Sequence, residues 1–138
     1  MLERFELDGE IQVHDGQLLV NGASHRGGVA RRVMVPQPHG FVAMPVKGAQ
    51  GVVGYLNGDP EQPVLLGYAN PGKVPEVGAG GTAIYDASGA VVSIVENKVR
   101  HVAAEHTIVG PLIIEGDITH TGNMTSSGVH QDANGFHT

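Results

Sequence analysis

The sequence predicts an all-β protein, and three observations carry this prediction. The 138 residues contain 21 glycines and 8 prolines, which leave few stretches long enough for an uninterrupted helix. Short runs of alternating apolar and polar residues recur between turn-forming dipeptides. In the last third of the chain, glycine returns at a regular interval, which indicates a structural repeat. A barrel and a repeat region are therefore expected.

The first 72 residues are predicted to form the barrel. From residue 11, Asp15-Gly16 separates two alternating runs, and this dipeptide is preferred in two-residue hairpin turns. Asn57-Gly58 marks another tight turn. Further strands are expected at 29–35, 41–46, 51–56 and 63–68. Five or six short strands within about 70 residues fit a closed, OB-like barrel better than a sandwich, which usually needs about 100 residues.

A Gly- and Pro-rich segment at 70–81 is typical of a linker or collar. Strand-like alternation resumes after it, with Ser88-Gly89 as a turn, and a short helix across 97–106 is the competing interpretation. We expect three parts, namely an OB-like barrel, a collar with the first β-helix strands, and a β-helix with its apex. Their predicted ranges are 1–72, 73–100 and 101–138.

Four glycines of the last third lie six residues apart, and the unit after them is one residue longer. If each unit is a short strand, glycine turns the corner and alternate side chains point inward. The predicted corners are Gly110, Gly116, Gly122 and Gly128. The inward-pointing side chains are apolar in the first units of the repeat and polar in the later ones. Its predicted core residues are Leu112, Ile114, Ile118 and Met124, and its inward histidines are His120 and His130.

Four such units bury too little apolar surface to be stable in one chain, so partner chains are expected to complete them. A monomeric β-helix of the hexapeptide acyltransferase type is the alternative, but it needs an aliphatic residue before each corner. Of the four residues in that position, Val109, Glu115, Thr121 and Ser127, only the first is aliphatic. The sequence therefore favours a trimeric, intertwined β-helix.

The composition excludes several classes of function. Eight basic residues against 14 acidic ones give a net charge of −6, which disfavours binding to nucleic acid. Without cysteine, the chain has no disulfides or thiolate metal sites. The charged N-terminus lacks the apolar run of a signal peptide, and no run of about 18 apolar residues occurs, so synthesis in the cytoplasm is expected.

No enzyme motif is found in the sequence, so an enzyme is not predicted. Asp59 and Glu61 lie in a predicted turn, and turn chemistry explains them better than acid–base catalysis. The basic pair Arg31-Arg32 lies in a predicted strand, where one side chain should face outward and the other inward or toward a neighbour. An ordinary solvated face accounts for this pair.

The order of parts resembles a known family. Its marks are HGF at 39–41, GVVGYLNGDPEQPVLLGY at 51–68, the collar, IYDASGAVVSIV at 84–95, the Gly-spaced repeats and a histidine near the end. Over nearly the whole chain, this order resembles the central spike, or baseplate assembly protein V, of Mu-like contractile-tailed phages and R-type pyocins.

The resemblance implies a structural homotrimer of the virion, attached to the baseplate hub, that punctures the host outer membrane when the sheath contracts. A tip-capping protein is a further possible partner. Spikes of this family often end in His-x-His, which holds a metal, commonly iron, on the three-fold axis. His137 would be the ligand here, with one Fe per trimer, although the given chain ends before a second His. A solvated chain end is the alternative for His137.

The inward His120 and His130 are candidates for contacts with an ion or anion on the axis, with ordinary core histidines as the alternative. Two rival functions remain. One is a hexapeptide-repeat acyltransferase with His106 or His120 as its base. The other is an OB-fold module that binds single strands or sugars, but basic grooves and exposed aromatic residues are scarce in this chain.

Overall fold

The computed structural model describes residues 2–132 and 135–137, and it confirms the all-β prediction. The chain divides into two units, Met1–His106 and Thr107–Thr138. The first unit holds a closed barrel and a separate three-stranded sheet. The predicted boundaries near residues 72 and 100 stay predictions. Among the described residues, no helix is long and apolar enough to cross a membrane.

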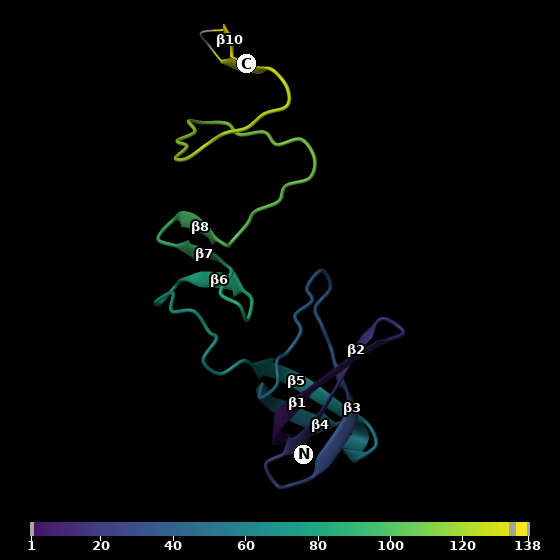
Figure 1. Ribbon diagram of the computed structural model, residues 1–138. Coiled ribbons are helices and arrows are strands. Elements are labelled where there is room, and N and C mark those ends of the chain that lie inside the picture. Colours follow the sequence, from purple (N-terminus) through teal and green to yellow (C-terminus); the bar gives the residue numbers. More distant parts are fainter. Residues whose placement is uncertain (1, 133–134, 138) are drawn as a thin grey trace. The chain divides into compact units, whose positions relative to one another are not determined.

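Five strands close the barrel in the order β1-β2-β3-β5-β4 (Figure 1). Only the β3–β5 pair is parallel, and it is short. This closed barrel is consistent with the predicted OB-like fold. The strands are β1 (Leu2–His14), β2 (Gln17–Ser24), β3 (Val29–Val35), β4 (Gln50–Tyr55) and β5 (Pro63–Ala69).

The long strand β1 pairs with β2 on one side and with β4 on the other. Gly9 has φ +96° and lies within a register shift between Leu7 and Ile11. This irregularity bends β1, so that the strand can pair with both β2 and β4. The hairpin predicted at Asp15-Gly16 is confirmed, with φ of +49° and +75°. The first strand begins earlier than the predicted residue 11, because the alternation of buried and exposed side chains already starts with buried Phe5 and Leu7.

The barrel core is aliphatic apart from one aromatic ring. Phe5, Val20, Val33, Val53 and Leu65 are its largest fully buried side chains. They come from all five strands, so closure of the barrel and burial of the core depend on each other. Each of these side chains contributes about 1.5–3 kcal/mol by leaving water.

The predicted strand at 41–46 is wrong. These residues lie in the long loop between β3 and β4, which we call the β3–β4 loop (residues 36–49). Pro45 has no N–H for a ladder, and the carbonyl of Ala43 is bonded by side chains instead of by a strand. Because the apolar run is not paired, Phe41 and Val42 are exposed.

A three-stranded antiparallel sheet follows, in the order β6-β7-β8. Its strands are β6 (Thr82–Tyr85), β7 (Val91–Val95) and β8 (Lys98–Val102). The turn at Ser88-Gly89 is confirmed, with Gly89 at φ +107°. The competing helix at 97–106 is wrong. Glu96 and Asn97 have φ of +51° and +66°, which makes a two-residue hairpin turn and returns the chain into β8.

The second unit contains β9 (His130–Asp132) and β10 (Gly135–His137), which pair antiparallel. From Thr107 to Val129, the described chain forms no strand. A monomeric left-handed β-helix would show pairing between successive turns of one chain over this segment. The trimeric β-helix stays a prediction, since it requires strands from other copies.

Candidate functional site

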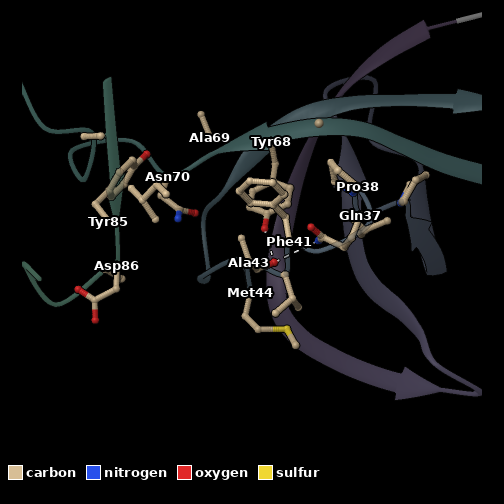
Figure 2. A pocket seen from close by; sticks show the side chains of 17 residues that line it. Gln37, Pro38, Phe41, Ala43, Met44, Tyr68, Ala69, Asn70, Tyr85 and Asp86 are labelled. Carbon is tan, nitrogen blue, oxygen red and sulfur yellow. Dashed lines mark hydrogen bonds between the residues drawn. The ribbon is translucent and has the colours of Figure 1, made fainter. Parts of the chain in front are cut away.

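A hollow of the first unit lies beside the β3–β4 loop (Figure 2). It is a groove of about 670 Å³. Its walls are this loop, the end of β5, and the segment from β6 into the following turn. The lining is mainly apolar and includes Pro36, Pro38, Phe41, Val42, Met44, Tyr68 and Ile84. Such a surface is suited to contact with another apolar surface.

Side-chain hydrogen bonds hold the loop at Ala43. The hydroxyl of Tyr68 and the Nε2 of Gln37 both donate to the Ala43 carbonyl, the latter at 3.2 Å (Figure 2). The N–H of Phe41 donates to the carbonyl of Pro38 at 3.0 Å. Phe41 is nevertheless 65% exposed and Val42 is 72% exposed. The loop therefore presents apolar side chains on a backbone that is already ordered, which lowers the entropy cost of binding.

Burial raises the pKa of Tyr68 above the usual value for a phenol, and the hydrogen bond with Gln37 opposes this rise. The neutral phenol is the form that donates to Ala43. Its stabilising contribution is therefore complete below pH 10 and is lost as the pH rises through the raised pKa.

We expect Tyr68→Phe to lower the free energy of unfolding by about 1 kcal/mol at neutral pH, because one hydrogen bond is lost. The difference between the wild type and this variant should shrink above about pH 10, where the phenol ionises. Denaturant unfolding at neutral and alkaline pH measures both values. Tyr85→Phe is the control, because Tyr85 also lines the groove. A wild-type advantage that stays constant up to about pH 12 would contradict the assigned role of the hydroxyl.

The groove has little catalytic potential. Its ionisable lining residues are Tyr68, Tyr85 and Asp86. The Oδ1 atom of Asp86 accepts hydrogen bonds from the N–H groups of Ser88 at 3.0 Å and Ala90 at 2.9 Å. Asp86 therefore shapes the β6–β7 turn. Among the groove residues, no nucleophile lies beside a general base, and the arrangement favours binding over catalysis.

Two predictions about charged residues have different outcomes. Asp59 is confirmed as a turn residue, because its carboxylate accepts from the Glu61 N–H and the Gln62 Nε2, each at 2.9 Å. Arg31 and Arg32 are both exposed, which confirms the ordinary solvated face expected for this pair, but neither side chain faces inward. Arg32 has φ +54°, which interrupts the strand's alternation.

A side chain of the neighbouring strand β2 stabilises the bulge at Arg32 through a hydrogen bond. The N–H of Arg32 donates to the Oδ1 of Asn21 at 2.8 Å, and the Nδ2 of Asn21 donates to the Oε2 of Glu10 at 2.6 Å. The register of β2 and β3 shifts between Val20 and Gly22 in the same region. A non-glycine residue with positive φ gives no sequence signal, so alternation alone could not reveal this bulge.

Three of the predicted corner glycines have backbone angles that favour glycine. The φ values are +119° at Gly110, +139° at Gly116 and +110° at Gly122. The chain bends at each of them and again at Gly128, where φ is not in the left-handed region. Their role as corners of a β-helix stays a prediction.

The predicted core residues of the repeat are not covered by their own chain. Their side chains are between 53% and 67% exposed, and they are Leu112, Ile114, Ile118 and Met124. His106 and His120 are exposed as well. The ring of His106 lies edge-on to that of His101, with 6.0 Å between the centroids.

His130 and His137 occupy partnered positions of the β9–β10 ladder. Their side chains lie outside the described part of the structure. Within the described residues of one chain, no group of three His, Asp or Glu could hold a metal. A ligand set contributed by several chains remains a prediction.

Residues 5–72 match the family model described as Bacteriophage Mu Gp45, N-terminal. No curated protein matches the chain. The matched segment runs from within β1 to just beyond β5, so it coincides with the barrel. The match confirms the resemblance to the Mu-like baseplate and spike family that the order of motifs indicated, and it supports a structural protein of a phage baseplate rather than an enzyme.

Proposed function

We propose that this chain, whose residues 5–72 match the Mu Gp45 N-terminal family, is the central spike at the baseplate of a contractile phage tail. The family match over the barrel is the observation that carries this proposal. The barrel would attach the spike to the baseplate, and the Gly-spaced region would form its tip. The function is mechanical, so no catalytic residue is assigned.

We propose that the chain acts as a homotrimer. The second unit supports this, because its apolar side chains lack cover in a single chain. Ile108 is 65% exposed, Val109 95% and Ile113 84%. Exposed aliphatic residues of this density are unfavourable in water, and intertwined copies would bury them. Interlocked strands also leave few free edges and unfold slowly, which suits a tip that bears load.

The β3–β4 loop is the proposed contact with the baseplate hub. From residue 33 to residue 46, the sequence contains no Lys, Arg, Asp or Glu, although the whole chain has 22 of these residues. The loop is anchored at Ala43 and presents Phe41 outward. An ordered aromatic residue within an uncharged patch has the properties of an interface hot spot. A tip-capping protein and the host outer membrane would be met at the other end of the spike.

We further propose an apex metal, with His137 as a ligand. The pairing of His137 with His130 brings two histidines of each chain to neighbouring backbone positions. Imidazole nitrogens suit iron, so three chains would offer a sufficient donor set around a three-fold axis. His120 would be a separate contact for an ion or anion on the axis.

The metal proposal predicts about one Fe per three chains by elemental analysis of protein purified without a histidine tag. His137→Ala should lower the iron content at least tenfold, because a ligand is removed from every chain at once. His39→Ala is the control, since His39 lies in the exposed β3–β4 loop. Equal iron content in all three proteins, or none in the wild type, would contradict the apex site.

Immunogold electron microscopy of intact and contracted tails tests the proposed function. A peptide tag inserted at the exposed Asp15-Gly16 turn would be recognised by the antibody. Label should appear at the baseplate in extended tails and at the end of the tube in contracted ones. Label along the sheath, on the head, or only in unassembled protein would contradict a role as the central spike.

A further inference from the structure

Another hollow of the barrel lies on its outer face and is a cleft of about 300 Å³. Its lining comes from β2, β3, the end of β1, the start of β5 and the loop between β4 and β5 (residues 56–62), which we call the β4–β5 loop. In OB-like barrels, the face of the second and third strands, flanked by the loops after the first and fourth strands, binds oligonucleotides and oligosaccharides. The cleft therefore lies where this fold can hold a ligand, and its side chains must decide which one.

An apolar row crosses the floor of the cleft. Leu19 lies opposite Met34 in the β2–β3 ladder, and Met34 lies opposite Val64 in the short β3–β5 pair. Leu18 and Val20, the neighbours of Leu19 on β2, belong to the barrel core, so the row faces outward. Leu19 and Val64 are nevertheless only 7% and 6% exposed. This floor offers close apolar contact to the C–H groups of a small ring.

The rim of the cleft is polar and its charges are balanced. Its ionisable groups are the guanidinium of Arg32, the carboxylate of Glu61 and the imidazole of His14, and Gln17 adds an amide. Among the described residues, no ion pair joins Arg32 to Glu61. The guanidinium is a donor and the carboxylate an acceptor, so both can bond to hydroxyl groups, which donate and accept at once. Such a rim suits a ligand with several hydroxyls and no net charge.

Arg32 reaches the rim from a strained backbone. Arg31 and Arg32 together oppose Asn21 in the β2–β3 ladder, and the φ of Arg32 is +54°. A positive φ is unfavourable for a residue with a Cβ, so the bulge costs stability. It places Arg32 two residues before Met34, and both line the cleft. Strain of this kind is concentrated at functional positions, which makes the guanidinium the leading binding group.

The opposite rim has an ordered backbone. The carboxylate of Asp59 accepts hydrogen bonds from the Glu61 N–H and the Gln62 Nε2, each at 2.9 Å. The N–H of Leu56 donates to the carbonyl of Gln62 at 3.0 Å and closes the β4–β5 loop. The backbone that carries Glu61 is therefore in place before a ligand arrives, which lowers the entropy cost of binding.

We propose that this cleft binds a neutral sugar residue through adjacent hydroxyl groups. Arg32 donates to hydroxyl oxygens, Glu61 accepts from hydroxyls, and Gln17 does either, while the apolar row contacts the C–H face of the ring. The volume lies at the lower end of the range of about 300–1,000 Å³ for ligand sites, which fits one ring or the end of a glycan. This inference goes beyond the proposed mechanical role and does not depend on it.

Single-stranded nucleic acid suits the cleft less well than a sugar. The lining contains no Phe, Tyr or Trp on which bases could stack. The rim balances its one arginine with a carboxylate, and the whole chain has a net charge of −6, which repels a phosphate backbone. An oligothymidylate is therefore the comparison ligand in the test.

NMR titration of the full chain tests the proposal, with the methyl glycosides of glucose, galactose, mannose and N-acetylglucosamine as probes. We expect at least one of them to shift the amide signals of Gln17, Arg32 and Gln62, with a dissociation constant in the millimolar range. Arg32→Asn should weaken this binding at least tenfold, because the guanidinium is removed. Arg31→Asn is the matched control and should stay within twofold, since Arg31 is exposed but does not line the cleft.

The stability of the same two variants separates binding from folding. Asparagine tolerates a positive φ better than arginine, so Arg32→Asn should unfold at the same temperature as the wild type or at a higher one. Equal sugar binding by both variants, or shifts confined to other residues, would overturn the assignment of the cleft. Binding of the oligothymidylate without any glycoside would overturn the sugar class, and binding of no probe would overturn the site. The position of the protein in the tail, which immunogold labelling measures, is unaffected by each of these results.

Discussion

Gly51→Ala is expected to lower the free energy of unfolding of the barrel by about 3 kcal/mol, at the upper end of the usual cost of overpacking. A Cβ at Gly51 would lie 2.0 Å from the carbonyl oxygen of Gly67 and 3.0 Å from the Cδ1 of Leu65. The first neighbour is backbone in the paired strand, so it cannot move without disturbing the β4–β5 ladder. The register of that ladder already shifts between Gly51 and Val53.

Gly28→Ala is the matched control for this substitution. A Cβ there would meet only the Oγ of Ser24, at 3.4 Å, and the backbone is not in the left-handed region. Thermal unfolding followed by circular dichroism should show a large loss of Tm for Gly51→Ala and a small change for Gly28→Ala. Equal effects would mean that the close approach of β4 and β5 does not limit the stability of the barrel.

Gly116→Ala is expected to destabilise the tip by about 1–2 kcal/mol in each chain, because an L residue is strained at positive φ. The φ at Gly116 is +139°. In a trimer the cost falls on three chains, so the total approaches about 3–6 kcal/mol per assembly. The same reasoning applies to Gly110 and Gly122.

Gly128 provides the control within the same repeat. Its φ is not in the left-handed region, and nothing lies within 4 Å of an added Cβ. Gly128→Ala should therefore leave the thermal stability of the assembly nearly unchanged, while Gly116→Ala lowers it. If both variants unfold like the wild type, the glycine period has no structural role.

The barrel could be predicted well where local signals agree with the fold. The predicted range 29–35 coincides with β3, and Asp15-Gly16 forms the expected hairpin. The sequence does not predict the first half of β1, because Arg4 and Glu6 make this segment resemble a charged terminus, although Phe5 and Leu7 alternate with them into the core. The alternation is present in the sequence, but the charged residues between the apolar ones make the segment look like an exposed terminus.

The β3–β4 loop could not be predicted from apolar content, which is the same in a strand and in an exposed interaction loop. What decides between them is whether a neighbour pairs with the backbone. Here the carbonyl of Ala43 is bonded by Tyr68 and Gln37, which lie 25 and 6 residues away in sequence. Long-range side-chain anchors of this kind leave no periodic signal.

In the Gly-spaced repeat, the local pattern is clear in the sequence but the contacts that the segment makes are not. The spacing of Gly110, Gly116 and Gly122 was visible in the sequence, and their positive φ values agree with sharp changes of chain direction. Partners for these segments cannot be read from the sequence, because contacts between copies, as in the proposed trimer, have no counterpart along one chain. The exposed Leu112 and Ile118 are consistent with an incomplete core, which further copies of the chain would complete in the proposed trimer.

Hydrogen exchange of the backbone amides at residues 107–129, measured by mass spectrometry on the wild-type protein, tests the intertwined β-helix most directly. In the single chain these residues form no strand. In a trimer, their N–H groups would be bonded to neighbouring copies and would exchange slowly, with protection comparable to that of the barrel strands. Exchange at the rate of an unstructured peptide, at a concentration where the protein has its full assembled mass, would contradict the account.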